Sequence, residues 1–226
     1  NTGNNFDWVV SNAPSISAQY TNTTAIASTS GGNYMLLFGD SYNPGNPPYE
    51  DMDAYFQTSA IDLTGYPSVE IEFQQKFRYC CGQSDRLSFY VSNDNVNWTE
   101  FDTKEGVTIN SQSADPVVST VDISCIGGNQ STVYLRWHQQ DASHYYWMVD
   151  DILIREIPVS HELSIEFDYY LDPRLFPHYS MIPVNHIDTS IYAAEVKNNM
   201  PGTETGVMLN VTSDLTLASS SRSRFS

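Results

Sequence analysis

Apolar and polar residues alternate along much of the first 157 residues. Between Val69 and Tyr79 most odd-numbered positions are apolar, and the positions between them carry charged or amide side chains. A period of two is typical of a strand with one buried side and one solvent-facing side. The alternation recurs at 87–91 and at 133–138, and no segment keeps a helical period over three turns. The pattern therefore predicts an all-β fold with two stacked antiparallel sheets.

A second stretch of alternating residues begins after Pro158. Apolar residues occupy every other position over 163–169, and further strand signals follow. Three or four strands in residues 159–217 correspond to part of an immunoglobulin-like sandwich, which needs about seven strands. The tail, 218–226, has no apolar pattern and is predicted to be disordered. We therefore predict a sandwich domain over 1–157, followed by a partial immunoglobulin-like β segment that docks on it or is completed by other chain.

Composition narrows the classes of function. Lys and Arg number 10 and Asp and Glu number 27 in 226 residues, a net charge of −17. Such a chain repels phosphate backbones, so we expect no nucleic-acid partner and no direct membrane insertion. Few Lys and many Asn, Ser, Thr and Tyr residues predict a secreted or cell-surface protein. Because the chain starts at Asn1 without Met, we expect a segment of something longer.

Three cysteines, Cys80, Cys81 and Cys125, permit at most one internal disulfide. The adjacent pair could close on itself, or either member could reach Cys125. A Cys81–Cys125 disulfide would close a loop of roughly 45 residues and stabilise the fold by about 3–4 kcal/mol. The absence of a C-x-x-C spacing argues against a zinc ribbon or a thioredoxin-type site.

Three blocks in the first domain carry a family resemblance. They are Ala54–Leu63, Asp85–Asp94 with Trp98 after it, and Tyr146–Ile154 with its W-M-V-D-D-I core. In order and spacing they resemble the MAM-like jelly-roll family, which includes the cleaved-adhesin and "choice-of-anchor" domains of Bacteroidetes surface proteins. Asn95 stands where that family usually has Gly. The resemblance implies a non-catalytic jelly roll, often with structural Ca²⁺, in secreted or surface-anchored proteins.

The same resemblance implies an ion site where early loops meet the closing strand. Ca²⁺ takes six to eight hard oxygen ligands, and carboxylates with loop carbonyls supply them. A carboxylate at a strand start is costly to bury unless it is paired or bound to metal. We predict a structural Ca²⁺ with Asp51, Asp53 and Asp151 as first candidates, and with Asp150 and Asp40 beside them. The alternative is a solvated acidic loop.

Tyrosines in loops are candidates for an exposed aromatic patch. Sugar rings stack on such side chains, and protein interfaces also favour them. Trp98 and Trp147 are expected to lie in the core instead. The candidate ligand-binding residues are Tyr42, Tyr49, Tyr145 and Tyr146.

No catalytic motif is present. The five histidines show no H-E-x-x-H spacing, and the chain has no G-x-S-x-G, P-loop or dinucleotide fingerprint. We predict a non-catalytic adhesion or binding module whose partner is a surface protein or a glycan. One alternative is a carbohydrate-binding accessory module of a larger secreted hydrolase or peptidase. Another is an architectural subunit of a surface filament or layer, which pairs with other copies through its incomplete C-terminal β segment.

Overall fold

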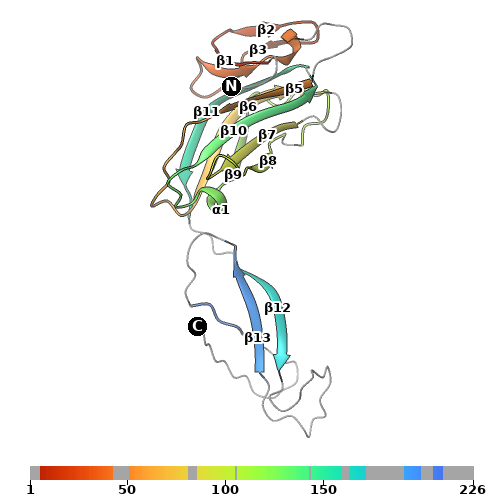
Figure 1. The fold of residues 1–226 in the computed structure, drawn as a ribbon. Helices are drawn as coiled ribbons and strands as arrows, with labels where there is room; N and C mark the ends of the chain where they lie inside the picture. Colours follow the sequence, from red (N-terminus) through yellow and green to blue (C-terminus); the bar gives the residue numbers. More distant parts are fainter. Residues whose placement is uncertain are drawn as a thin grey trace. The chain divides into compact units, whose positions relative to one another are not determined.

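The chain divides into two compact units, Asn1–Val159 and Ser160–Ser226, and each is described by itself (Figure 1). The computed structural model describes eight stretches of the chain. They are residues 6–42, 51–80, 86–104, 106–142, 144–158, 163–171, 191–199 and 206–210.

The first unit contains two antiparallel sheets of four and five strands. The five-stranded sheet consists of β1 (Trp8–Ser11), β4 (Tyr34–Leu37), β11 (Tyr146–Glu156), β6 (Val69–Arg78) and β9 (Val117–Asp122), in that order. The four-stranded sheet consists of β5 (Asp51–Gln57), β10 (Tyr134–Ala142), β7 (Arg86–Ser92) and β8 (Thr99–Asp102), in that order. The predicted all-β antiparallel sandwich is confirmed.

The two sheets enclose one apolar core, to which both contribute alternate residues. Leu135 and Trp137 of β10 are fully buried, and Trp137 stacks on Phe56 with ring centroids 4.7 Å apart. Phe73 of β6 meets the edge of the Trp137 ring from the opposite sheet, at 5.4 Å. Trp147 is fully buried, as predicted. The period of two seen in the sequence therefore sorts each strand into a core side and an outer side.

Gln75 is the one core-facing position of β6 where the apolar alternation fails, and its buried amide is fully used. Its Oε1 accepts a hydrogen bond from the Trp147 indole at 2.8 Å, and its Nε2 donates to Ser119 and to the Thr103 carbonyl, both at 2.7 Å. A buried amide costs little when its donors and acceptor are paired. This network links the neighbouring strands β6, β9 and β11 with Thr103, which follows β8 of the opposite sheet.

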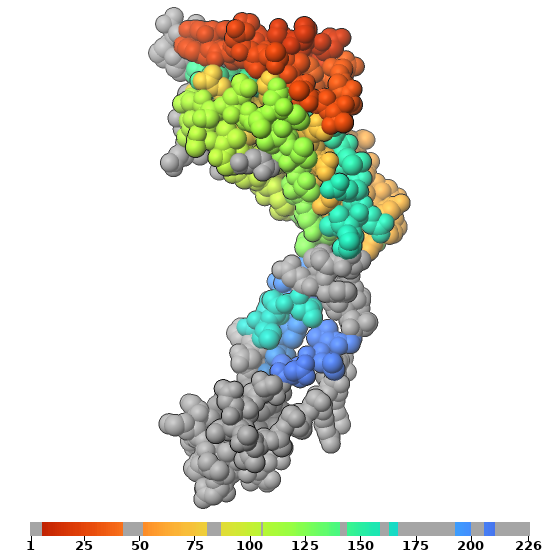
Figure 2. All heavy atoms as spheres, turned by 180° about the vertical axis from the view of Figure 1, so that it is seen from behind, coloured from red at the N-terminus to blue at the C-terminus, as the bar shows by residue number. Residues whose placement is uncertain are grey.

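The N-terminal segment covers the other face of the five-stranded sheet. It contains the short strands β2 (Ser15–Ser17) and β3 (Asn22–Thr24) and forms one continuous surface layer, red in Figure 2. Ile16 and Ile26 of this segment pack with Tyr146 and Met148 of β11 in a second buried cluster. The first four residues of β11, Tyr146–Val149, are therefore buried on both sides.

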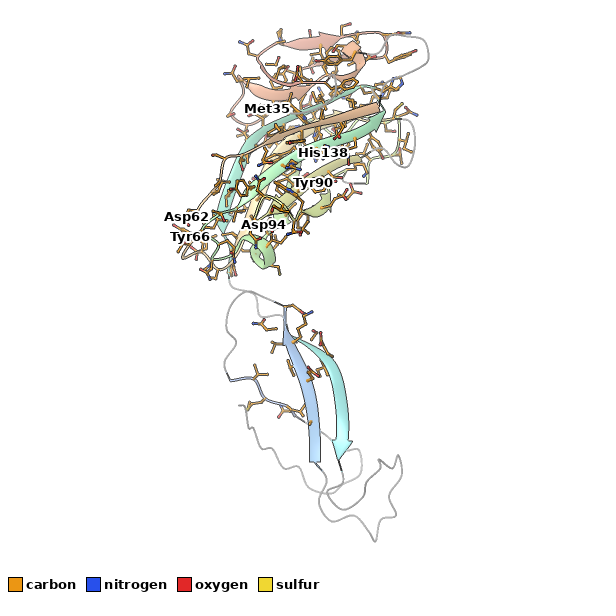
Figure 3. All side chains as sticks on the ribbon, in the orientation of Figure 1. Met35, Asp62, Tyr66, Tyr90, Asp94 and His138 are labelled. Carbon is orange, nitrogen blue, oxygen red and sulfur yellow. The ribbon has the colours of Figure 1, made fainter. Side chains whose placement is uncertain are left out.

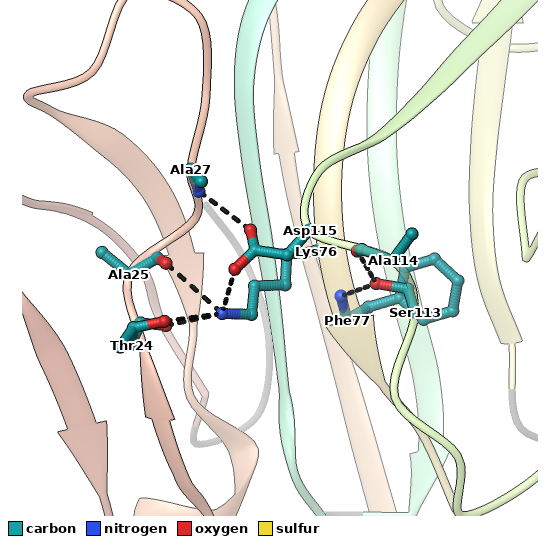
Figure 4. A network of polar contacts seen from close by, with 8 residues as sticks. All are labelled: Thr24, Ala25, Ala27, Lys76, Phe77, Ser113, Ala114 and Asp115. Carbon is teal, nitrogen blue, oxygen red and sulfur yellow. Dashed lines mark hydrogen bonds and ion pairs between the residues drawn. The ribbon is translucent and has the colours of Figure 1, made fainter.

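A buried lysine fastens this segment to the sheet (Figure 4). Lys76 of β6 is almost fully buried, and its ammonium donates to the Thr24 carbonyl at 3.0 Å and the Ala25 carbonyl at 3.3 Å. The same ammonium lies 2.7 Å from Oδ2 of Asp115, whose Oδ1 accepts from the Ala27 N–H at 2.8 Å. We call these five residues the Lys76 clamp.

The predicted Cys81–Cys125 disulfide is wrong. Cys125 is an exposed thiol on the short helix α1 (Ser124–Gly127), whereas Cys80 is buried and disulfide-bonded. The Ser124 hydroxyl accepts from the N–H of Val69, so α1 lies where β6 starts. Cys81 itself lies outside the described residues, but it follows the far end of this 10-residue strand. Such a strand spans about 33 Å, and a disulfide needs Cα atoms within about 7 Å.

The described part of the second unit is an antiparallel pair of strands. β12 (Leu163–Leu171) pairs with β13 (Ile191–Asn198), and the register shifts between Ile165 and Phe167. Residues 206–210, where the sequence predicts a further strand, are in no strand. The immunoglobulin-like completion of this segment remains a prediction, and the tail 218–226 lies outside the described residues.

Candidate binding face

The register of the four-stranded sheet aligns polar and aromatic side chains on its outer side. Residues opposite one another in neighbouring strands form rows across a sheet. One row consists of Gln57, Arg136, Tyr90 and Glu100. The next consists of Tyr55, His138, Ser88 and Asp102. We use the name "β10 face" for the surface made by Asp53, Tyr55, Gln57, Tyr90, Trp98, Glu100, Asp102, Arg136 and His138.

Arg136 lies at the centre of the β10 face, between two aromatic rings. Its guanidinium carbon is 4.1 Å from the ring centroid of Tyr55 and 3.7 Å from that of Trp98. Its Nε and Nη2 donate to Oε1 of Gln57 at 3.2 and 2.8 Å. Burial lowers the pKa of Arg136, but a guanidinium stays protonated at neutral pH. The stacked rings and the Gln57 amide therefore hold a cation in a fixed plane.

His138 is the second polar group that the fold fixes on this face. Its Nε2 lies 2.5 Å from Oδ1 of Asp53, and a carboxylate can only accept, so the ring proton is on Nε2. The rings of Tyr55 and Tyr90 flank the imidazole, with centroids at 5.4 and 5.8 Å. Burial lowers the pKa of His138, and the bond to Asp53 offsets part of that shift. The imidazole is therefore neutral at pH 7.

The hairpin turn before β8 positions Trp98 over Arg136. Oδ1 of Asp94 accepts from the backbone N–H groups of Val96 and Asn97 at 2.8 and 2.7 Å, and these bonds hold the pKa of Asp94 well below its usual range. Asn95 takes the left-handed φ of 61°, a conformation that Asn tolerates better than most residues.

The β10 face also brings serine, histidine and aspartate together, but not in a catalytic arrangement. Ser88 lies opposite His138, whose ring binds Asp53. The Ser88 hydroxyl donates instead to Oε1 of Glu100 at 2.6 Å, and only 1% of Ser88 is exposed. A nucleophilic serine must reach both its base and the substrate. This one reaches neither, so Ser88 is not placed to act as a nucleophile.

The predicted calcium ligands do not gather at one place. Asp53 lies on the β10 face, whereas Asp150 and Asp151 lie at a bulge of β11 and hold the N-terminal segment. Oδ2 of Asp150 accepts from the Ser28 hydroxyl at 2.5 Å, and Oδ2 of Asp151 accepts from the Ser30 N–H at 2.9 Å. Hydrogen bonds from Ser30 lower the pKa of Asp151.

Asp40 is the predicted ligand whose surroundings suit a cation. It is 2% exposed, and its Oδ2 accepts from the Tyr20 N–H at 2.8 Å. Its Oδ1 is buried and finds no hydrogen-bond donor among the described residues. Asp51 lies in β5 opposite Ala142, with its side chain outside the described set. The described residues contain no group of three His, Cys, Asp or Glu side chains placed to hold a metal.

The predicted aromatic patch is wrong for two of its four members. Tyr145 and Tyr146 are 9% and 1% exposed, because the N-terminal segment covers them and Arg78 lies over the Tyr145 ring at 3.9 Å. Tyr42 is exposed and meets the edge of the Phe6 ring. Tyr49 lies outside the described residues.

Sequence reasoning missed the residues that make the β10 face. Trp98 was expected in the core, but it is only partly buried and lies against Arg136. The signal was present at Arg136 and His138, which occupy the polar positions of an alternating strand. Nothing in the sequence pairs these positions with Tyr55 or Tyr90.

Comparisons with known proteins give fold-level similarity only. No protein-family model matches the chain, and no curated protein matches it by sequence. The K1 cleaved adhesin domain of Lys-gingipain from Porphyromonas gingivalis W83 is 17% identical, over 59% of this chain and 80% of that one, with a TM-score of 0.38. The CBM22-1 xylan-binding domain of Paenibacillus barcinonensis Xyn10C is 14% identical, over 70% and 86% of the two chains, with a TM-score of 0.33. No helix among the described residues is long and apolar enough to span a membrane.

Proposed function

We propose that this chain is a non-catalytic binding module that takes a glycan on the β10 face. The observation that carries the proposal is the stack of Tyr55, Arg136 and Trp98, with Gln57 fixing the guanidinium. Binding sites combine apolar or aromatic surface with a few fixed polar groups. The stack supplies both and costs no ordering when a ligand arrives.

The mixture of groups on the face favours a sugar. The apolar side of a pyranose packs on aromatic rings, and its hydroxyls both donate and accept. Carboxylates of Asp53 and Glu100 are acceptors for those hydroxyls, and Arg136 is a donor. The Asp53 side chain is 56% exposed, and its Oδ1 holds His138. If the ligand is a protein instead, no glycan should compete with its binding to this chain.

A secreted or cell-surface location belongs to the same proposal. A disulfide at Cys80 supports an oxidising compartment, because cytosolic reductants keep thiols reduced. The net charge of −17 supports solubility and disfavours contact with anionic lipid.

We also propose a structural Ca²⁺ at Asp40 rather than at the five carboxylates together. A buried carboxylate oxygen without a donor is costly, and a cation would satisfy it. Asp40 would be the protein's charged ligand there, and the ion would neutralise the buried charge. Since Asp53, Asp150 and Asp151 already have hydrogen-bond partners, they are not needed for this role.

Affinity measurements on soluble polysaccharides test the glycan proposal. Wild type should bind at least one of β-glucan, galactomannan, xylan or mannan by calorimetry or affinity electrophoresis. Trp98→Ala and Arg136→Ala should each weaken that binding by about tenfold or more, because each removes one of the three members of the stack.

Tyr66→Ala is the matched control, because Tyr66 is an exposed ring that Figure 3 places away from His138 and Tyr90. It should leave affinity unchanged. Thermal melting curves of the three variants show whether each is folded, and so distinguish a loss of binding from a loss of structure. Equal affinity in wild type, Trp98→Ala and Arg136→Ala would overturn the assignment of the face.

A further inference from the structure

We infer that the β10 face selects neutral glycans and rejects chains that carry uronate carboxylates. This inference rests on the proposed function and names the ligand class of the same site. It follows from how the charge of Arg136 is surrounded, because an arginine on a binding face otherwise suggests a carboxylate ligand.

Arg136 offers a ligand carboxylate only one of its two bidentate edges. Two of its nitrogens, Nε and Nη2, are turned toward Gln57. The guanidinium also lies against two aromatic rings, with its central carbon 4.1 Å from the Tyr55 centroid and 3.7 Å from the Trp98 centroid. A bidentate pair with a ligand carboxylate needs two parallel N–H groups on one free edge. The Gln57 amide, a neutral acceptor, already occupies the edge made by Nε and Nη2, so only the Nη1/Nη2 end is left for a ligand.

Two carboxylates of the protein share the β10 face with the cation. Asp53 acts electrostatically on Arg136, and Glu100 lies in the same row across the sheet, separated from Arg136 by Tyr90. His138 is neutral at pH 7 and adds no positive charge. A ligand carboxylate on the face would meet Asp53 and Glu100 as like charges, whereas a hydroxyl would donate to them.

The remaining charges of the face do not reverse this balance. The Lys104 ammonium forms an ion pair with Oδ1 of Asp102, at 3.0 Å. Arg86 lies opposite Gln140, in the row beyond His138, and its side chain lies outside the described residues. The rest of the chain is acidic, but charges farther than about 8 Å are screened at physiological salt. Asp53 and Glu100 are therefore the residues that determine the selection.

Matched pairs of polymers test the inference. Each pair is a neutral β-glucan, galactomannan or mannan together with the same polymer oxidised at C6 to the uronate, measured at pH 7 and physiological salt. Wild type should bind the neutral member at least about tenfold more tightly. The double variant Asp53→Asn/Glu100→Gln should reduce that ratio severalfold, because the hydroxyls of the neutral member lose their charged acceptors and the oxidised member no longer meets like charges.

The control is Asp62→Asn/Glu156→Gln, which removes the same two charges from exposed positions on other parts of the first unit. It should keep the wild-type ratio. A ratio near one in wild type would overturn the selectivity and leave glycan binding intact. Absence of binding to every polymer would overturn the proposed function, and the selectivity with it. An equal loss of the ratio in both double variants would overturn the assignment to Asp53 and Glu100.

Discussion

The imidazole of His138 is shielded by two tyrosine rings, and its side chain is only 13% exposed. Burial disfavours the imidazolium and lowers the pKa below the ordinary value of 6.5, while Asp53 works in the opposite direction. We predict that Asp53→Asn lowers the pKa of His138 further, because it removes the opposing charge. The measurement is the NMR titration of the His138 ring protons in wild type and variant.

The sign of the pH dependence of stability follows from the same shift. The folded state holds fewer protons than the unfolded state between the folded pKa of His138 and 6.5. His138 therefore contributes stability that is fully present above 6.5 and lost as pH falls through that window. Glu156→Gln, an exposed change outside the β10 face, should leave the titration unchanged. A higher pKa in Asp53→Asn would contradict the account.

At the scale of elements, the Lys76 clamp explains how a short N-terminal segment stays attached to a sheet. Its strands β2 and β3 have three residues each, too few to be stable alone. We predict that Lys76→Met destabilises the first unit by about 2–4 kcal/mol, because it leaves Asp115 and two carbonyls without their shared donor. Chemical denaturation followed by tryptophan fluorescence measures it.

Lys104→Met provides the comparison for that variant. Lys104 pairs with Asp102, which is 67% exposed, and such pairs contribute less than about 1 kcal/mol. The double variant Lys76→Met/Asp115→Asn should recover part of the loss, since no unpaired charge remains. Equal stability of Lys76→Met and wild type would show that apolar packing of the second cluster alone holds the segment.

Elements with a long alternating pattern could be predicted from sequence, and the short covering segment could not. The period of two in β6 and β10 identifies both strands and their core sides. The apolar run of β11 indicated burial on both faces, but β2 and β3 are too short to show a period, so the sequence did not show which segment covers it. Tyr145 and Tyr146 were therefore predicted to be exposed, although the covering segment buries them. The prediction of exposure failed because the burial of these tyrosines depends on a segment distant in sequence, not on their local sequence.

At the scale of the whole molecule, the candidate face depends on register between strands that are distant in sequence. Tyr55 and His138 are neighbours because β5 pairs with β10, more than 80 residues later in the chain. A shift of one residue would turn every side chain of the face inward. The alternation within one strand does not specify the register between strands. The sequence therefore predicted the polar positions of each strand, but not which of them lie side by side on the β10 face.

A Ca²⁺ bound at the buried Oδ1 of Asp40 would stabilise the whole folded molecule. An ion that binds only the folded state adds about 2.7 kcal/mol at one hundred times its Kd. For a chain of this size we therefore predict that CaCl₂ raises Tm by about 5–10 °C over EDTA. Asp40→Asn should abolish that difference and should not lower Tm in EDTA, because it removes a buried charge.

Asp53→Asn is the matched control for the calcium experiment. Asp53 carries the same side chain and was also a predicted ligand, but its carboxylate lies on the β10 face, bonded to His138. Its variant should keep the full response to CaCl₂. A response lost in Asp53→Asn and kept in Asp40→Asn would move the ion to the β10 face. If wild type has the same Tm in CaCl₂ and in EDTA, the protein has no structural calcium site. The free-energy cost of burying the Asp40 carboxylate is then offset by the packing of the rest of the sandwich.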